Sequence, residues 1–374
     1  MELSVRKSDL LRELQLFQGI IERKNTIPIL ANVLIEATNK SEIQLLATDL
    51  EVGLRSRCPA SVTETGSLTL PAKKLYEIVR ALPETDVRIQ QGAKGSIKVA
   101  AEKFSSRMQA LPPEDFPTLP EIGSAEGSLL SIPRVILREM VAKTQFSITG
   151  EDTRYFLNGG LFILETNKIQ LVTTDGHRLA LVSVLQAKVT ESKSEVRAIL
   201  PKKTMWELSR LLVDGEGDVR YQVGENHLFF EVDGRQLISR VIDAQFPAYE
   251  RVIPKGNDKH VEFDRDRLAS AIKRVALLSS ERSRAVKFQI DKGKIDITSS
   301  SPEVGEATET LAVDYDGEAL QICFNAQYIQ DFLGVVDTDS VQLEFKDEMS
   351  QVVMRPVGSD DGCDYTYVIM PMRV

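Results

Sequence analysis

The feature that most constrains this chain is a short stretch that occurs three times, at a constant interval of 126 residues. Ile-Gln-Leu-Val-Thr-Thr-Asp at 169–175 resembles Ile-Gln-Leu-Leu-Ala-Thr-Asp at 43–49 and Ile-Asp-Ile-Thr-Ser-Ser at 295–300. Glu-Val-Gly at 51–53 returns two intervals later, at 303–305. A repeat much longer than the roughly 20 to 50 residues of a solenoid turn indicates whole domains in tandem. We therefore expect three modules of one fold, over residues 1–120, 121–254 and 255–374.

Apolar spacing gives the modules one plan, in which a strand, a helix and three strands occur twice. Leu10 and Leu14 recur at helical spacing, and we expect Ser8 or Asp9 to cap that first helix. Residues 86–90 alternate polar and apolar side chains, as a strand with one buried face does. The order of these segments predicts an α+β fold.

Three prolines mark the beginnings of further helices. Pro71, Pro133 and Pro201 each precede a segment with helical spacing, and we expect each to be a first helical residue. Two more helices are expected in the last module, around 268–275 and 328–333.

Composition excludes several classes of protein. A hydrophobic content of 42% and a charged content of 27% are typical of a globular chain. No apolar run approaches the roughly 18 residues of a membrane span. The charged N-terminal stretch does not resemble a signal peptide. Three widely spaced cysteines, Cys58, Cys323 and Cys363, suit a reducing compartment, so we expect a cytoplasmic protein.

The charge distribution favours nucleic acid although the net charge of −9 argues against it. The segments with helical spacing are 8–24, 71–82, 131–149, 201–212, 264–284 and 325–336. Together they carry +8, so the remainder carries −17. Lysine and arginine recur at matching places after two of the prolines: Lys73, Lys74 and Arg80, then Lys202, Lys203 and Arg210. These side chains could simply solvate exposed helices, but their repetition favours a sequence-indifferent phosphate track.

Signs of catalysis or of metal binding are weak. The three histidines lack metal-ligand spacing, and no phosphate loop, dinucleotide fingerprint or Gly-X-Ser-X-Gly turn occurs. Asp175 and His177 could form an acid/base pair, which would make the chain a hydrolase. Asp175-Gly176 is more simply a hairpin turn. We expect no catalytic residue, metal or cofactor.

The C-terminal stretch 367–374 is unusually apolar for a terminus and contains two methionines. Burial as the last strand of module three would explain it, and so would a place in a binding groove. Both interpretations can hold together.

Several stretches resemble one known family over the whole chain, the beta sliding clamp of bacterial DNA polymerase III. They are Arg-Tyr-Phe-Leu-Asn-Gly at 154–159, Thr-Asp-Gly-His-Arg-Leu at 174–179, Phe-Pro-X-Tyr at 246–249 and Met-Pro-Met-Arg at 370–373. The resemblance implies a homodimer joined head to tail into a ring of six like domains, with helices lining the hole and sheets outside. Such a ring encircles duplex DNA as a processivity factor and is not an enzyme.

The resemblance also implies a pocket for short peptide motifs between modules two and three. Its residues would be Leu157, Thr174, Gly176, His177, Arg178, Leu179, Pro247, Arg251, Val252, Asn325, Tyr328, Val368, Ile369, Met370, Pro371, Met372 and Arg373. The implied partners are the catalytic subunit of DNA polymerase III, the clamp loader, other polymerases, ligase and mismatch repair proteins. Ser283 departs from the family, which can have an aromatic residue at this rim.

Contacts with DNA and with a second protomer complete the implied sites. The family's DNA contacts correspond to Lys24, Lys73, Tyr155, Phe156 and Lys203, and Gly150-Glu151 departs from the family in the same loop. Leu277 and Leu278 match one side of the protomer interface, with Ile78 and Leu82 as the expected opposing side. A different class of function, a monomeric scaffold of three peptide-binding domains without a DNA role, is suggested by the isoelectric point of about 5.2.

Overall fold

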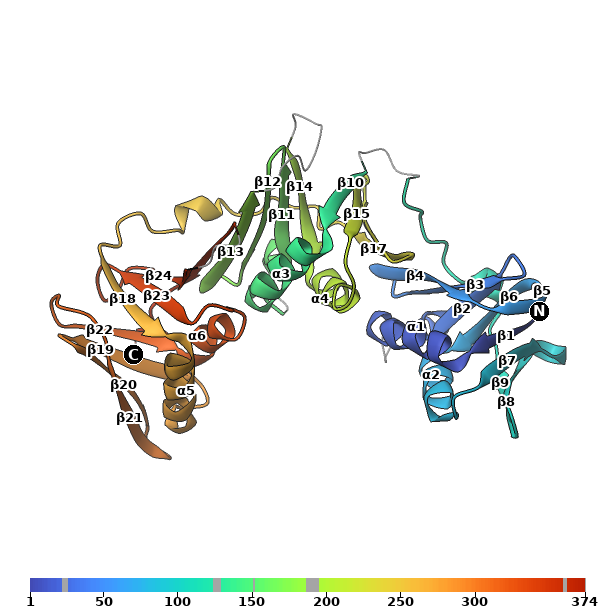
Figure 1. Cartoon of the computed structure of the whole chain (residues 1–374), viewed down its shortest axis with the longest axis horizontal. Helices are drawn as coiled ribbons and strands as arrows, with labels where there is room; N and C mark the ends of the chain where they lie inside the picture. Colours follow the sequence, from blue (N-terminus) through green and yellow to red (C-terminus); the bar gives the residue numbers. More distant parts are fainter. Residues whose placement is uncertain (22–25, 124–128, 151, 186–194, 359–361, 374) are drawn as a thin grey trace. The chain divides into compact units, whose positions relative to one another are not determined.

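The computed structural model describes residues 1–21, 26–123, 129–150, 152–185, 195–358 and 362–373 (Figure 1). Its element order confirms the α+β plan of a strand, a helix and three strands given twice in each module. Module one contains β1 (Glu2–Arg6), α1 (Lys7–Ile20), β2 (Asn32–Ala37), β3 (Glu42–Thr48), β4 (Val52–Pro59), β5 (Ser61–Glu64), β6 (Gly66–Pro71), α2 (Ala72–Ala81), β7 (Asp86–Gln91), β8 (Ser96–Ala101) and β9 (Phe104–Gln109).

The other two modules repeat this order without a counterpart of β5. Module two contains β10 (Leu130–Pro133), α3 (Arg134–Thr144), β11 (Gly159–Glu165), β12 (Lys168–Thr174), β13 (Arg178–Leu185), β14 (Val196–Pro201), α4 (Lys202–Leu211), β15 (Asp218–Val223), β16 (His227–Val232) and β17 (Arg235–Arg240). Module three contains β18 (Lys259–Asp264), α5 (Arg265–Val275), β19 (Ala285–Asp291), β20 (Lys294–Ser301), β21 (Gly305–Ala312), β22 (Leu320–Asn325), α6 (Ala326–Leu333), β23 (Ser340–Phe345), β24 (Val352–Val357) and β25 (Cys363–Ile369).

The chain divides into two compact units, and the central module contributes strands to both. Unit 1 comprises residues 1–137 and 203–241, and unit 2 comprises residues 138–202 and 242–374. Unit 1 has a five-stranded sheet, β5-β1-β7-β8-β9, and an eight-stranded sheet, β10-β15-β16-β17-β4-β3-β2-β6. Unit 2 has an eight-stranded sheet, β14-β11-β12-β13-β25-β24-β23-β18, and a four-stranded sheet, β21-β20-β19-β22.

Each eight-stranded sheet is continuous across a junction between two modules. In unit 1, β17 of module two pairs antiparallel with β4 of module one, with Ser239 opposite Val52. In unit 2, β13 of module two pairs antiparallel with β25 of module three, with Arg178 opposite Ile369. Each of these four strands is the last of the three strands that follow a helix, and we call it the strand that closes that half of its module. Main-chain hydrogen bonds between these strands join the modules, in addition to side-chain packing.

Helices pack in pairs within each unit and bury the apolar faces that the spacing predicts. In unit 1, α1 packs on α2 and on β4, and its Leu10, Leu14 and Phe17 are fully buried. In unit 2, α5 lies beside α6, as Figure 1 shows. Full burial of each such side chain contributes about 1.5 to 3 kcal/mol, so each helix pair anchors the sheets beneath it.

Two expectations about helix beginnings are wrong. Pro71, Pro133 and Pro201 end the strands β6, β10 and β14, and the helices begin one residue later. The prolines are still paired in their sheets, Pro71 with Asn32 for example. They can stand there because their φ also suits a strand end.

The first helix also begins differently from the expectation, because neither Ser8 nor Asp9 caps it. The helix starts at Lys7. Arg6 occupies the N-cap position, and its side chain makes no capping hydrogen bond. Instead the Lys7 amide donates to the Thr85 carbonyl at 3.0 Å, and the Ser8 amide donates to Glu84 Oε1 at 3.2 Å. A loop distant in sequence therefore satisfies these helix-terminal donors.

Candidate functional site

An apolar hollow of about 260 Å³ lies in unit 2, at the end of the β12–β13 hairpin and of β25. Most of the predicted peptide-binding residues meet there. The lining residues are Arg154, Phe156, Leu157, Thr174, Gly176, His177, Arg178, Leu179, Pro247, Val252, Val368 and Met370. A hollow of this size that is apolar and carries a few polar groups at its mouth suits a small set of apolar anchor side chains.

The β12–β13 turn is shaped by its own side chains. Asp175 Oδ1 accepts the amides of His177 and Arg178, at 2.9 and 3.0 Å. Thr174 Oγ1 donates to the Arg178 carbonyl at 2.6 Å and accepts the Gly176 amide at 3.1 Å. Gly176 has a φ of +88°, which favours glycine. The expected Asp-Gly turn is present, and the Asp175 carboxylate stabilises it by accepting hydrogen bonds from backbone amides.

Arg178 ties this turn to the rest of the pocket. Its Nε donates to Asp175 at 3.0 Å, one terminal nitrogen donates to Asp331 at 2.5 Å, and the other donates to the Phe146 carbonyl at 2.6 Å. The guanidinium carbon lies 4.3 Å from the ring centre of Tyr328. Burial acts against the charged form, but the Tyr367 hydroxyl and the two carboxylates raise the pKa of Arg178 above its ordinary value.

The C-terminal segment closes one side of the pocket through main-chain hydrogen bonds. The Met370 amide donates to the His177 carbonyl at 2.9 Å. The Met372 amide donates to the Cys323 carbonyl of β22 at 2.8 Å. Tyr367 and Ile369 are fully buried in β25, while Met370 reaches the hollow. The segment thus ends a buried strand, and its Met370 lines the hollow.

A buried apolar cluster forms the floor beneath the hollow. Its members come from β11, β12, β13, β14, β24, β25 and the 3-10 turn Tyr249–Arg251: Leu161, Ile163, Val172, Leu179, Ile199, Tyr249, Val353 and Val368. Phe156, Phe246 and Val252 pack against this cluster and are partly buried. Strands of modules two and three and the 3-10 turn Tyr249–Arg251 therefore meet here.

Several predicted pocket residues lie around the hollow and do not line it. Asn325 caps α6, because its Oδ1 accepts the Gln327 amide at 2.9 Å. Arg251 and Arg373 are exposed, and Pro371 and Met372 are partly buried. A bound segment would contact these residues only where it extends beyond the hollow.

Arg154 lines the hollow although the sequence reasoning did not select it. Its guanidinium is bidentate with Asp152, at 3.0 and 2.7 Å, and this pairing lowers the pKa of Asp152 to about 2. A Cβ on Gly176 would meet the same guanidinium at 3.1 Å. The signal was its neighbourhood in the Arg-Tyr-Phe-Leu stretch that carries the resemblance.

Two basic residues of α4, Lys203 and Arg210, are bound within unit 1. Lys203 Nζ donates to the Ile20 carbonyl at 3.0 Å and to the Asp49 carboxylate. Arg210 donates to the Gln15 carbonyl at 2.7 Å and to Glu207 at 2.8 Å. These two residues therefore hold α4 against α1, and part of their charge is neutralised locally.

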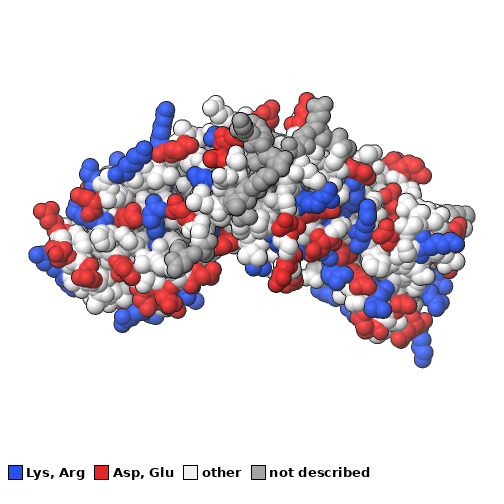
Figure 2. Space-filling view, turned by 45° about the horizontal axis from the view of Figure 1, so that its top comes forward, with Lys and Arg blue, Asp and Glu red and all other residues white. Residues whose placement is uncertain are grey.

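The other predicted DNA contacts differ in exposure. Lys73, Lys74 and Arg80 of α2 are exposed, with both lysines beside Glu77. Tyr155 is 58% exposed. Phe156 belongs with the pocket lining, Lys202 is partly buried and Lys24 lies outside the described residues. Figure 2 shows basic and acidic side chains interspersed over the visible face.

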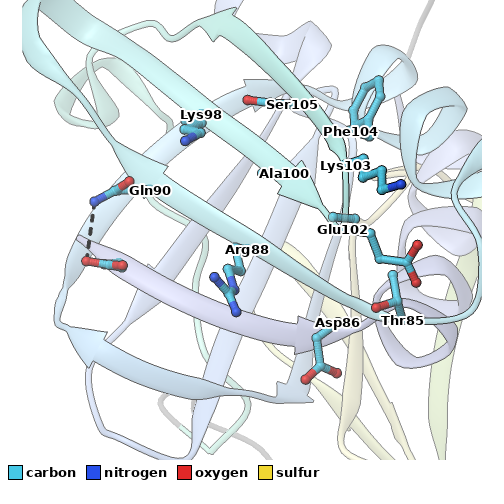
Figure 3. A pocket seen from close by; sticks show the side chains of 12 residues that line it. Thr85, Asp86, Arg88, Gln90, Lys98, Ala100, Glu102, Lys103, Phe104 and Ser105 are labelled. Atoms are coloured by element: carbon cyan, nitrogen blue, oxygen red, sulfur yellow. Dashed lines mark hydrogen bonds between the residues drawn. The ribbon is translucent and has the colours of Figure 1, made fainter.

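A second hollow, of about 520 Å³, lies on the sheet face formed by β1, β7, β8 and the start of β9 (Figure 3). Its charges are mixed: Arg88, Lys98 and Lys103 stand among Asp86 and Glu102. It is polar where the hollow of unit 2 is apolar, so it offers no comparable place for apolar anchors.

The four residues predicted for the protomer interface differ in solvent exposure. Leu277 is 77% exposed and Leu278 partly buried, in the 3-10 turn Ala276–Leu278 after α5. Ile78 of α2 is partly buried. Leu82 is 6% exposed and caps α2 through its backbone. Leu277 thus offers the largest exposed apolar surface of the four.

Neither a metal site nor a membrane-spanning helix is found where the structure describes the chain. No group of three or more histidine, cysteine, aspartate or glutamate side chains in those ranges is arranged to hold a metal ion. In the same ranges, no helix is both long enough and apolar enough to cross a bilayer.

Comparison with known proteins matches the chain to one family along its whole length. Models of the N-terminal, central and C-terminal domains of the DNA polymerase III beta subunit match residues 1–120, 131–248 and 250–373. The beta sliding clamp of Pseudomonas putida is 38% identical over the full length of both chains. Crystal structures of the Pseudomonas aeruginosa protein, one of them bound to griselimycin, cover both chains fully at a TM-score of 0.92 and at 36% and 35% identity.

Proposed function

Because the chain belongs to the beta sliding clamp family, the beta subunits of DNA polymerase III, we propose that two copies close into a ring around duplex DNA. The family consists of processivity factors without catalytic activity, and the chain is a DNA sliding clamp in this sense. We further propose that partner proteins dock in the hollow of unit 2, and that the modules span 1–120, 121–254 and 255–374. As a replication protein it would act in the cytoplasm.

The observation that supports ring closure is that the modules join by the same strand pairing at both junctions. At both junctions, the strand that closes the first half of one module pairs with the strand that closes the second half of the next: β4 with β17, and β13 with β25. Two closing strands remain, β21 of module three and β9 of module one, and each is the last strand of its sheet. Under the same rule β21 would pair with β9 of a second copy, which gives a head-to-tail dimer.

Charge and apolar exposure support this pairing of edges. Lys103 and Arg107 are exposed at β9, and Glu303 and Glu306 are exposed at β21. The strongly exposed Leu277 follows α5, which packs against β21. Unpaired strand edges are liable to unwanted association, so covering both edges in a closed dimer also removes that liability.

A ring would hold DNA by topology, so its direct contacts can be weak. Lys73, Lys74 and Arg80 on α2 would supply part of a sequence-indifferent attraction, together with Lys24, Lys202, Lys203, Arg210, Tyr155 and Phe156. Because Lys203 and Arg210 are partly neutralised by Asp49 and Glu207, the attraction per helix is modest. Weak, non-specific contact is what sliding requires.

The hollow of unit 2 would bind short linear segments of the polymerase catalytic subunit, the clamp loader, other polymerases, ligase and mismatch repair proteins. Apolar anchors would enter between Leu179, Val252 and Val368, and a few such anchors supply most of the affinity of an interface. The griselimycin complex of the Pseudomonas aeruginosa clamp is consistent with ligand binding in this family.

Retention on DNA of defined topology tests the ring. Light scattering should give the mass of two chains, and protein loaded onto nicked circular DNA should stay bound until the circle is linearised. Escape through free ends means encirclement. A monomer mass, or retention that is indifferent to ends, would favour a scaffold of peptide-binding domains and refute the ring.

Deleting residues 370–374 tests the pocket. The deletion removes Met370 from the lining and its amide bond to His177, so binding of a polymerase-derived peptide should be lost. The dimer mass should not change, because these residues lie outside β9 and β21. Undiminished peptide binding would refute this pocket as the docking site.

A further inference from the structure

The helices α2 and α4 share more than their basic residues. The segment 71–82 reads Pro-Ala-Lys-Lys-Leu-Tyr-Glu-Ile-Val-Arg-Ala-Leu, and 201–212 reads Pro-Lys-Lys-Thr-Met-Trp-Glu-Leu-Ser-Arg-Leu-Leu. A planar aromatic residue, Tyr76 or Trp206, is followed by glutamate and then by arginine in both. Spacing of four residues places ring and arginine on one face of a helix.

In both copies the ring is at least partly exposed. Trp206 is 48% exposed, although its neighbours Met205 and Leu208 are fully buried. Tyr76 is partly buried, and the Arg80 guanidinium lies 5.4 Å from its ring centre. The buried side chains of α4 therefore pack without the exposed face of the Trp206 ring.

In the third module, the residue at the position of the aromatic ring makes a contact between helices. The residue equivalent to Trp206 is Gln330 of α6, whose side-chain amide donates to the Ala269 carbonyl of α5 at 2.7 Å. Gly334 stands where the arginine would be. An exposed apolar side chain alone means little, but a ring and an arginine that recur together in two modules and are both absent from the third indicate a shared ligand.

We propose that Trp206, with Arg210 and the lysines of the first turn of α4, forms a stacking platform for unpaired bases of single-stranded DNA. Tyr76 and Arg80 form the weaker equivalent on α2. In a duplex the flat faces of the bases are covered by stacking and only their edges are open in the grooves. A single strand instead offers base faces to an indole and phosphates to the flanking cations. This role goes beyond the encirclement of duplex DNA and does not depend on it.

Trp206 is the single tryptophan of the chain, so its emission reports on this position alone. The full-length protein is titrated at low salt with an oligothymidylate of about 12 nucleotides, within the range of single-strand site sizes, and with a blunt duplex of the same length. We expect the single strand to quench the indole emission saturably, an effect that added salt weakens, and the duplex to quench it far less. Equal quenching by both, or none by the single strand, overturns the proposal.

Affinity measured with a fluorescent oligothymidylate gives a second readout. Trp206→Gln should weaken binding about tenfold, and Trp206→Phe should recover part of the loss because it restores a ring. Val135→Gln on α3, where the side chain is 50% exposed, is the matched control and should bind as the unchanged protein does. Unchanged binding by Trp206→Gln would refute stacking. Dimer mass and retention on circular DNA should be normal in all three variants, so a failure of the ring would be recognised separately.

Discussion

At the scale of single residues, two partly buried arginines show how charge is used for structure in this protein. Arg178 joins the pocket turn to α6 through Asp175 and Asp331. Arg235 of β17 is bidentate with Glu13 of α1, at 2.8 and 2.6 Å. In both cases the charge is already satisfied inside one unit, so the arginine positions its neighbours and offers little charge to a ligand.

Replacing Arg178 by methionine should therefore damage the pocket through its framework. The variant leaves Asp175 and Asp331 without their cation, and removing one partner of such a pair costs about 3 kcal/mol of unfolding free energy. Peptide affinity should fall as well, because the turn loses its link to α6. Chemical denaturation and peptide titration measure the two effects. Arg154→Met is the control: this arginine lines the same hollow but is half exposed, so its stability should change by less than about 1 kcal/mol. Equal effects of the two variants would contradict the positioning role.

Glu13 makes the stability of unit 1 depend on pH. Burial alone would raise the pKa of this carboxyl, but hydrogen bonds and charge from Arg235, with smaller contributions from Ser56 and Arg12, lower it below its ordinary value. A depressed pKa in the folded state stabilises the protein above the unfolded-state value of about 4.5, and this contribution is lost as the pH falls through the folded value. Glu13→Gln should flatten the fall in unfolding free energy that occurs as the pH drops below about 4.5. The double variant Glu13→Gln/Arg235→Met should be as flat and more stable than the single one. A single variant as steep as the unchanged protein would show that other carboxyls dominate.

The roles of individual basic residues were the part that sequence could predict least. Lys203 and Arg210 repeat the positions of Lys73 and Arg80, and the sequence gives all four the same role. Their environments differ because Lys203 and Arg210 meet α1, a partner about 190 residues away that no local pattern announces. Arg178 is predicted from the sequence as a peptide contact. Only its hydrogen bonds to Asp331 of α6 and to the Phe146 carbonyl reveal that it links the turn to neighbouring elements.

At the scale of elements, the helices and strands follow from apolar spacing, and the differences have local causes. The plan of each module was predictable because period and burial agree, as in β7, where Val87 and Ile89 are buried and their neighbours are not. The added strand β5 pairs with β1 through Val62 opposite Leu3, and four residues with one buried side chain give almost no periodic signal. The helix beginnings shifted because proline can end a strand as well as start a helix.

The pocket turn can be compared with its counterpart in module one. Asp49 accepts the amides of Glu51 and Val52 as Asp175 does in module two. Leu50 stands where Gly176 does, with a φ of +79°. The same turn therefore tolerates a side chain in module one, at a backbone cost of about 1 kcal/mol. In module two the glycine leaves the mouth of the hollow open beside Arg154.

Transferring the module-one residue should close the pocket without unfolding the protein. Gly176→Leu directs a side chain at the Arg154 guanidinium, 3.1 Å from the Cβ position, and into the hollow. We expect peptide affinity to fall at least about tenfold, equivalent to 1.4 kcal/mol, with a stability loss of about 1 kcal/mol. Calorimetric titration and thermal unfolding measure both. The reciprocal Leu50→Gly should leave peptide binding unchanged. A Gly176→Leu variant that binds normally would show that the hollow is not the docking site.

At the scale of the whole molecule, the net charge of −9 and the proposed contact with DNA are compatible. A ring that holds its DNA by encirclement needs only a weak local attraction, and the net negative charge of the chain limits non-specific contact with other DNA. The two open edges, β9 with lysine and arginine and β21 with glutamates, are also of opposite sign. Opposite charge at these two strand edges favours pairing of β21 with β9 of another copy over contact between like edges.

Reversing the charge of one edge should therefore open the dimer, and reversing both should close it again. Lys103→Glu with Arg107→Glu sets acidic residues against Glu303 and Glu306 of the next copy. We expect the dissociation constant of the dimer to rise at least about tenfold. Adding Glu303→Arg and Glu306→Arg restores opposite signs and should recover most of the affinity, while Glu250→Arg, an exposed change outside both edges, should have no effect. Light scattering over a dilution series measures these changes, and raising the salt should shrink all of them because exposed charges are screened. If the four-residue variant dissociates as readily as the two-residue one, the edges do not face each other, and the closing-strand rule would not extend to the second copy.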